Sequence, residues 1–215
     1  LTAAFRATAG GTVTLLVTYS YDAWGNRISR QVWDGTTTTE RYGLDGWDPA
    51  KSDTIGNEGF DAWADVDGSG VLVTRRVWGS TTTELVASET GAGVVSWNLT
   101  DRLGSVRLVT DSTGAVTGAV LYDAYGNVTA GAVPEAYGYA GYRYDAEAAL
   151  YSPGNGTREY DPAAGRWHQP DPLGFDAGDA NLYRYVGNQP TGATDPSGLD
   201  TLKIVGNDVL WESRD

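Results

Sequence analysis

SVRLVTDSTGAVTGAVLY, residues 105–122, decides the fold class of this chain. The runs at 105–110 and 115–122 have the composition and length of β-strands, and Asp111-Ser-Thr-Gly114 between them has the composition of a tight turn. The stretch therefore predicts a β-hairpin. Further strands are expected at 12–19, 27–33, 36–42, 71–78 and 81–86, separated by Gly-centred turns. No apolar period of 3.6 residues continues long enough to predict a helix.

Composition supports an all-β fold and narrows the function. The 215 residues include 29 Gly, 13 Tyr and 8 Trp but no Met and no Cys. Aromatic and β-branched residues favour pleated surfaces, and frequent Gly favours turns. A net charge of -13 argues against nucleic acid and against anionic membrane surfaces as partners. No apolar run reaches the ~20 residues of a membrane span. Without a Met or a signal peptide at its start, the sequence is expected to be a fragment of a longer chain.

A short motif occurs twice. Tyr21-Asp-Ala-Trp-Gly-Asn26 and Tyr122-Asp-Ala-Tyr-Gly-Asn127 agree at five of six positions. Repeated hairpins cannot bury their faces alone and need neighbours. We therefore expect a sheet that grows strand by strand. The stretch 45–65 has weak periodicity and predicts an ordered loop or a poorly formed strand pair.

The last third of the chain carries an ordered series of motifs. In sequence these are Asp101–Asp111, Tyr122–Asn127, Tyr139–Asp145, Arg158–Trp167, Gln169–Phe175, Asn181–Pro190 and Asp195–Leu199. Together they resemble the RHS repeat-associated core domain of RHS/YD-repeat proteins over residues 97–199. The resemblance extends to the shell-forming C components of bacterial toxin complexes and to RHS toxins.

The resemblance implies an all-β architecture. Antiparallel YD-repeat hairpins would form part of a spiralling β-sheet shell, with an inward-curling core, or plug, at the C-terminal end. The implied divisions are hairpins at 1–96, the core domain at 97–199 and a tail at 200–215, where 201–205 and 209–211 predict two small strands. The implied partners are the rest of the shell, a C-terminal effector or tail, and other subunits of a secretion or toxin complex. The implied location is secreted or on the bacterial cell surface.

The family's core domain also implies self-cleavage after its Asp-Pro-x-Gly-Leu motif. On this chain the scissile bond would join Leu199 to Asp200, Pro196 and Gly198 would shape the motif, and the matching acidic residues are Asp171 and Asp195. When two carboxyl groups lie close together, one can act as a base toward water and the other as an acid. They lie 24 positions apart (171 to 195), so only the fold can bring them together. Arg166 is the candidate for holding one carboxylate ionised or binding the oxyanion.

Each candidate also has a structural explanation. Asp-Pro pairs commonly open turns, and a structural ion pair is the more ordinary role for Arg166. His168, the only histidine, is expected to have a packing or surface role. Asp65–Gly70 resembles the start of a calcium loop, but Arg76 stands at the twelfth position, where a bidentate Glu is required, so the stretch predicts a turn instead. No cofactor or metal site is expected.

Three functions remain open from the sequence. The first is a structural shell module that encapsulates a C-terminal segment or effector and acts as an intramolecular aspartyl autoprotease, with no external substrate. The second is a non-catalytic surface scaffold, adhesion or fibre module that binds carbohydrate or protein partners through exposed aromatic side chains. The third is a hydrolase of an external substrate, for which no independent site is visible.

Overall fold

The computed structural model describes residues 2–23, 26–44, 62–79, 83–154 and 158–199, and the backbone of strands at 201–205 and 208–212. Within these ranges the regular structure is antiparallel β apart from three short 3-10 helices, and it contains no α-helix. The all-β prediction is therefore confirmed. None of the helical turns in these ranges has the length and apolar character needed to cross a bilayer.

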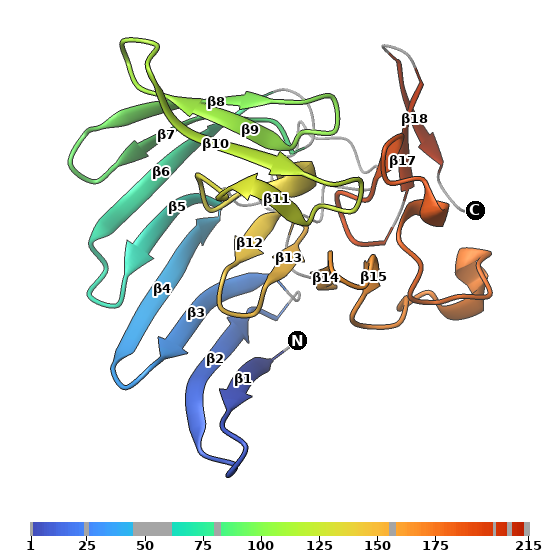
Figure 1. Ribbon diagram of the computed structural model, residues 1–215, viewed down its shortest axis with the longest axis horizontal. Helices are drawn as coiled ribbons and strands as arrows, with labels where there is room; N and C mark the ends of the chain where they lie inside the picture. Colours follow the sequence, from blue (N-terminus) through green and yellow to red (C-terminus); the bar gives the residue numbers. More distant parts are fainter. Residues whose placement is uncertain are drawn as a thin grey trace.

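Eleven of the described strands form one open antiparallel sheet, in which each strand pairs with the next one along the chain. Figure 1 shows them as a fan that begins with the dark blue β1. Consecutive hairpins produce this order because a tight turn returns the chain beside the strand it has just left. The strands are β1 (Ala3–Ala7), β2 (Val13–Tyr21), β3 (Arg27–Trp33), β4 (Thr37–Leu44), β5 (Ala62–Asp67), β6 (Leu72–Trp78), β7 (Leu85–Thr90), β8 (Val95–Thr100), β9 (Val106–Thr110), β10 (Val116–Tyr122) and β11 (Val128–Gly131).

The turn between β9 and β10 shows how the hairpins close. Asp111 Oδ1 accepts the backbone N–H groups of Thr113 at 2.8 Å and of Ala115 at 3.0 Å. Gly114 has a φ of +85°, a left-handed conformation that glycine adopts without steric cost. The two strands pair antiparallel on either side of the turn. The hairpin predicted at 105–122 is therefore confirmed.

Asp67 makes the same kind of turn before β6, where its Oδ1 accepts the N–H groups of Ser69 and Val71. The interpretation of 65–70 as a turn rather than a calcium loop agrees with this geometry.

The strand expected at 81–86 is displaced. Among the described residues, Thr83 has a φ of +67°, which no regular strand contains, and the N–H of Gly79 donates to the carbonyl of Glu84 at 2.8 Å. Residues 81 and 82 lie outside the described part, and β7 begins only at Leu85. Of the stretch 45–65, residues 45–61 lie outside the described part, and its end forms the start of β5. β1, β8 and β11 were not expected from the sequence.

The architecture changes after Gly131. The eleven-stranded sheet runs across the division predicted between residues 96 and 97, and only then do short strands and helical turns follow. The two strands predicted in the tail are confirmed as β17 (Thr201–Val205) and β18 (Asp208–Glu212). The elements are η1 (Tyr139–Gly141), β12 (Arg143–Asp145), β13 (Leu150–Ser152), β14 (Tyr160–Asp161), β15 (Arg166–Trp167), η2 (Gly174–Ala177), η3 (Val186–Asn188), β16 (Ala193–Thr194), β17 (Thr201–Val205) and β18 (Asp208–Glu212).

Aromatic rings form the core of this C-terminal segment. Tyr139 is 1% exposed and lies at the centre of the cluster. Large buried rings supply much apolar area and pack well at offset or edge-on angles. Its ring centroid lies 5.9 to 6.5 Å from those of Tyr122, Tyr142, Tyr151, Tyr160 and Tyr185.

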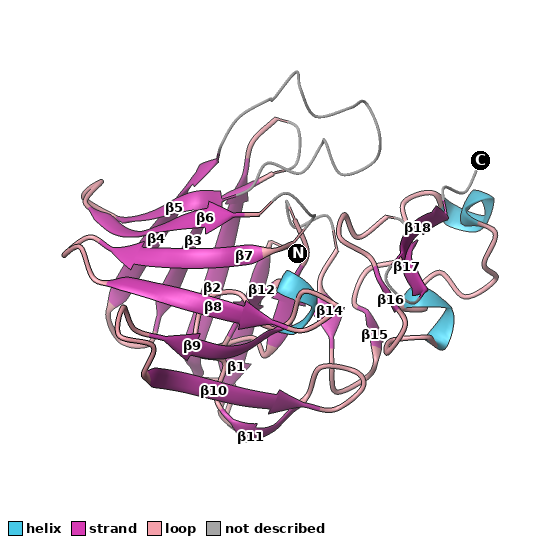
Figure 2. Cartoon of the chain, turned by 90° about the horizontal axis from the view of Figure 1, so that it is seen from above, coloured by secondary structure: helices cyan, strands magenta, loops and turns pink. Residues whose placement is uncertain are grey.

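Buried ion pairs join the C-terminal segment to the sheet. Figure 2 shows the sheet curving around β12 and β14. Asp65 of β5 accepts from Arg76 of β6 at 2.6 Å and from Arg143 of β12 at 3.1 Å. Arg27 of β3 pairs with Glu159, and both side chains are almost fully buried. Buried charges are tolerated only when they are paired, so these contacts specify how the segment docks. The predicted inward-curling plug is confirmed.

Candidate functional site

The fold brings Asp171 and Asp195 together on one arginine. Arg158 Nη1 lies 3.2 Å from Asp171 Oδ2, and Arg158 Nη2 lies 3.1 Å from Asp195 Oδ2. The three side chains are only 4 to 8% exposed. A guanidinium presents its N–H donors in a fixed planar fork, so one arginine can hold two carboxylates in a defined relation. This arrangement offsets the repulsion between two acidic groups that share a buried site.

The third guanidinium nitrogen of Arg158, Nε, contacts the predicted cleavage motif. Its Nε donates to the carbonyl oxygen of Gly198, one residue before Leu199. The guanidinium also lies 4.4 Å from the centroid of the Trp167 ring. Burial lowers the pKa of Arg158, while Asp195 and Asp171 act in the opposite direction. Arginine retains its charge even so, because its ordinary pKa is far above neutrality.

Asp195 occupies a tight turn directly after β16. Its backbone N–H donates to Tyr142 Oη at 2.8 Å, and the same hydroxyl donates to the Asp195 carbonyl at 2.9 Å. The N–H of Gly198 closes the turn on that carbonyl at 3.3 Å. A Cβ on Gly198, whose φ is +75°, would lie 3.2 Å from Pro153 Cγ, so the position favours glycine on both counts. The turn is fixed from several sides.

Asp171 is also held by its backbone. Its N–H donates to the carbonyl of Leu182 at 2.8 Å, and its own carbonyl accepts from Gly174 at 2.9 Å. Its Oδ1 accepts the N–H of Leu173 at 3.0 Å, which leaves Oδ2 directed at Arg158. Turn geometry thus orients both acidic side chains toward one cation.

The remaining predicted residues lie around this centre. Pro196 and Gly198 are buried and Leu199 is partly buried, with its N–H donating to Ser197 Oγ at 3.1 Å. Asp200 lies outside the described residues. β17, which follows, pairs with β16, so the described tail backbone returns beside the strand that leads into Asp195.

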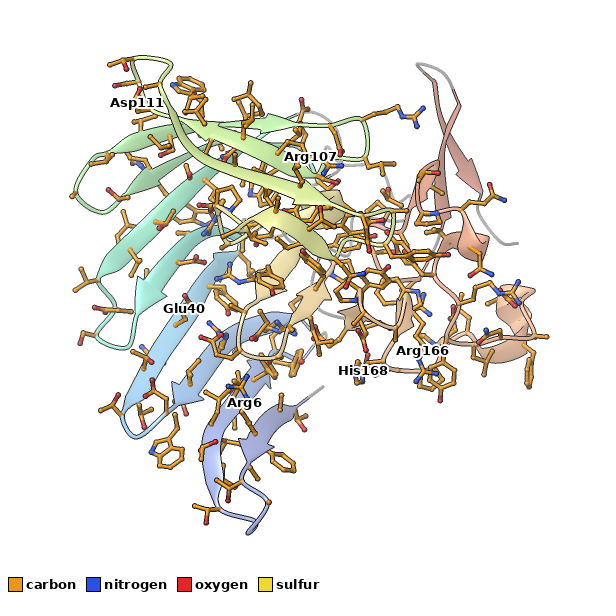
Figure 3. The ribbon with its side chains drawn as sticks, viewed as in Figure 1. Arg6, Glu40, Arg107, Asp111, Arg166 and His168 are labelled. Atoms are coloured by element: carbon orange, nitrogen blue, oxygen red, sulfur yellow. The ribbon has the colours of Figure 1, made fainter. Side chains whose placement is uncertain are left out.

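The structure does not bring Arg166 to the two carboxylates. Its side chain is exposed at the surface (Figure 3), and its guanidinium lies 5.7 Å from the centroid of the Tyr183 ring. Trp167 is 1% exposed, and neighbours on a strand face opposite sides, so Arg166 points outward. His168 is half exposed, with Nε2 3.8 Å from Asp161 Oδ2.

Sequence reasoning missed Arg158, although it opens the motif Arg158–Trp167 that contains Arg166. The available signal was the position of Arg166 directly before Trp167. A tryptophan in a short strand is expected to face the core, which directs the preceding side chain to solvent. Arg158 has no such neighbour and was the better candidate.

Comparisons with known proteins agree with the fold. The family model of the Teneurin YD-shell matches residues 85–191. Toxin subunit YenC2 of Yersinia entomophaga is 35% identical over 128 residues, which cover 56% of this chain and 13% of that protein. Toxin protein Tse5 of Pseudomonas aeruginosa is 31% identical over 202 residues, which cover 84% of this chain and 15% of that protein.

Solved structures show the same architecture. The TcdB2-TccC3 crystal structure superposes with a TM-score of 0.64 at 20% identity and covers 92% of this chain. The Tc holotoxin pore of Photorhabdus luminescens gives a TM-score of 0.61 and covers 96%. At this identity the likeness establishes the fold alone. This chain spans 10% of the length of either matched chain.

Proposed function

This chain belongs to the RHS/YD-repeat proteins as a module of their YD shell, and on that premise we propose that it encloses a C-terminal segment or effector and cuts its own backbone after Leu199. One observation carries the proposal. Arg158 joins the buried carboxylates of Asp171 and Asp195 and donates to the carbonyl of Gly198, next to the residue at which the cut would occur.

The proposed chemistry is hydrolysis by water. One of the two carboxylates takes a proton from water as the water oxygen bonds to the carbonyl carbon of Leu199. The C–N bond to Asp200 then breaks, and the proton passes to the leaving amine. Arg158 supplies N–H donors for the oxyanion, the role first considered for Arg166. A donor already fixed beside the motif needs little rearrangement when negative charge develops.

Pairing of the tail favours retention after the cut. Ala193 and Thr194 of β16 pair with Lys203 and Leu202 of β17. A cleaved tail would therefore stay hydrogen-bonded to the core until it is unfolded. We infer that the partners are the rest of the YD shell, the downstream segment and other toxin-complex subunits, and that the protein acts outside the bacterial cell or on its surface. The toxin relatives support these inferences.

Mass spectrometry of tryptic peptides tests the cut. The protein is denatured first, which separates a retained tail. An intact chain yields the peptide from Tyr185 to Lys203, whereas a chain cut by itself yields a peptide that ends at Leu199. We expect the Leu199 end in the wild type and its absence in Asp195→Asn and in Asp171→Asn.

Asp161→Asn is the matched control, because Asp161 also precedes a proline but lies against His168 rather than Arg158. It should be cut like the wild type. A wild-type chain that remains whole, or an Asp195→Asn chain that is cut normally, would contradict the proposal.

A non-catalytic scaffold is the second candidate. Several large apolar side chains on the sheet are exposed, including Phe5 at 70%, Trp97 at 48% and Leu121 at 60%. Exposed apolar groups on a sheet can serve contact with another surface. This function predicts a folded wild-type protein in which no chain ends at Leu199.

A further inference from the structure

The segment that carries Arg158 lies between the predicted cleavage site and the shell wall. Successive residues of an extended chain face opposite sides. Accordingly, Arg158 contacts Asp171 and Asp195, whereas Glu159 contacts Arg27 of β3. The two contacts of neighbouring residues thus connect the cleavage site to the sheet.

The Arg27–Glu159 pair is fully enclosed. The side chain of Arg27 is 5% exposed and that of Glu159 is 1% exposed. The Arg27 guanidinium lies 4.3 Å from the centroid of the Tyr19 ring on the neighbouring strand. Burial raises the pKa of Glu159, while Arg27 acts to lower it. The pair joins residues 132 positions apart, so it forms only after the sheet and the C-terminal segment have met.

The repeated YD motif explains why Arg27 is available there. Arg27 directly follows the first copy, Tyr21–Asn26. Within that turn Asp22 Oδ1 accepts the N–H of Asn26 at 2.9 Å, and the Asn26 carbonyl accepts the N–H of Asp22 at 2.9 Å. The turn therefore fixes the start of β3 and the direction of its first side chain.

The second copy of the motif holds the same segment farther along. Asn127 Nδ2 donates to the carbonyl of Pro162 at 2.8 Å, and Tyr160 Oη donates to the carbonyl of Tyr125 at 2.8 Å. Residues 158–162 are thus attached to one YD turn through Glu159 and to the other through Tyr160 and Pro162.

We propose that Arg27 and Glu159 are a positioning pair that holds Arg158 between the two carboxylates, so that self-cleavage requires the first YD turn to be docked. The inference rests on the proposed function. Its consequence is an order of events: the shell wall forms first and the cut follows, because an undocked β3 leaves Glu159 unpaired and Arg158 displaced. Misplacing a reacting group by about 1 Å can slow a reaction roughly a hundredfold.

Cleavage kinetics test the pair. The protein is made by pulse-labelled cell-free synthesis and denatured at intervals, and the fraction ending at Leu199 is measured. Arg27→Gln and Glu159→Gln should each slow cleavage by about tenfold or more. Arg27→Lys keeps the positive charge but lacks the planar N–H donors of the guanidinium. Its cleavage rate should lie between those of the two Gln variants and that of the wild type. Glu159→Gln conserves shape and tests the pair even if Arg27→Gln does not fold.

Arg76→Gln is the matched control. Arg76 is equally buried and also joins the sheet to the C-terminal segment, through Glu135 at 2.7 Å, but it does not contact residues 158–162. Thermal unfolding should show that Arg76→Gln loses about as much stability as the Arg27 and Glu159 variants. Its cleavage rate should nevertheless stay within about threefold of the wild-type rate, a smaller change than a displaced reacting group produces.

A double-variant cycle decides whether the two residues act as one unit. Arg27→Gln with Glu159→Gln should cleave no more slowly than either single variant. Normal rates in both single variants would overturn the positioning pair while leaving self-cleavage intact, and so would equal slowing by Arg76→Gln. A wild type that is never cut overturns both proposals.

Discussion

Asp65 is predicted to contribute strongly to docking of the C-terminal segment. Its side chain is 5% exposed and lies between Arg76 and Arg143. Asp65→Asn keeps the shape but leaves two buried cations facing a neutral amide. Removing one partner of a buried pair costs about 3–5 kcal/mol. Arg76 keeps Glu135 and Arg143 keeps Glu40, so we expect the lower end, about 3 kcal/mol at neutral pH.

The loss of stability caused by Asp65→Asn should depend on pH. Burial alone would raise the pKa of Asp65, but Arg143 and Arg76 outweigh it and hold that pKa below its ordinary value. Because this pKa is lower in the folded state, ionised Asp65 contributes fully to stability above its unfolded-state pKa of about 4. The contribution is lost as the pH falls through the folded-state pKa. The difference between wild type and variant should therefore shrink below about pH 4.

Equilibrium urea unfolding, followed by tryptophan fluorescence at neutral pH and near pH 3, measures both effects. Asp34→Asn is the control, since Asp34 is exposed in the turn after β3, and it should cost less than about 1 kcal/mol. A loss below about 1 kcal/mol for Asp65→Asn, or one that does not change with pH, would refute the ion-paired docking.

Three further variants, one of them with a matched control, probe other parts of the molecule. Gly198→Ala should slow cleavage about tenfold in the peptide assay, because its Cβ would press on Pro153, whereas Gly178→Ala, with a similar φ of +74° and open space, should leave the rate unchanged. Tyr139→Ala should lower the free energy of unfolding by about 3–5 kcal/mol in urea titrations, because it removes the centre of the aromatic cluster. His168→Ala should leave the cleavage rate unchanged at every pH, because the side chain is half exposed and its ion-pair partner is Asp161 rather than Asp171 or Asp195.

Local chemistry explains why the hairpins could be predicted. Asp111 and Gly114 close their turn through contacts within five residues, so the local sequence is enough to predict the turn. The start of the strand after Gly79 was misplaced because Thr83 has a left-handed backbone conformation, and no glycine or asparagine at that position signals it.

The candidate site depends on contacts that local patterns do not contain. The resemblance to the RHS core domain singled out Asp171 and Asp195, but their meeting depends on Arg158, on the turn around Asp195 and on the buried Tyr142 hydroxyl. The Arg27–Glu159 pair spans 132 positions, and no periodicity in the sequence relates its members. Long-range pairing of this kind becomes visible only in the folded chain.

Isotope labelling gives the most direct test of self-cleavage by water. The protein is synthesised and allowed to cleave in water enriched in oxygen-18, then denatured and digested. We expect the peptide ending at Leu199 to carry the heavy oxygen in its new carboxylate, and we expect Arg158→Gln to yield no such peptide. A wild-type chain without an end at Leu199, or with the label in the side chain of Asp171 or Asp195, would contradict carboxylate-assisted hydrolysis at this site.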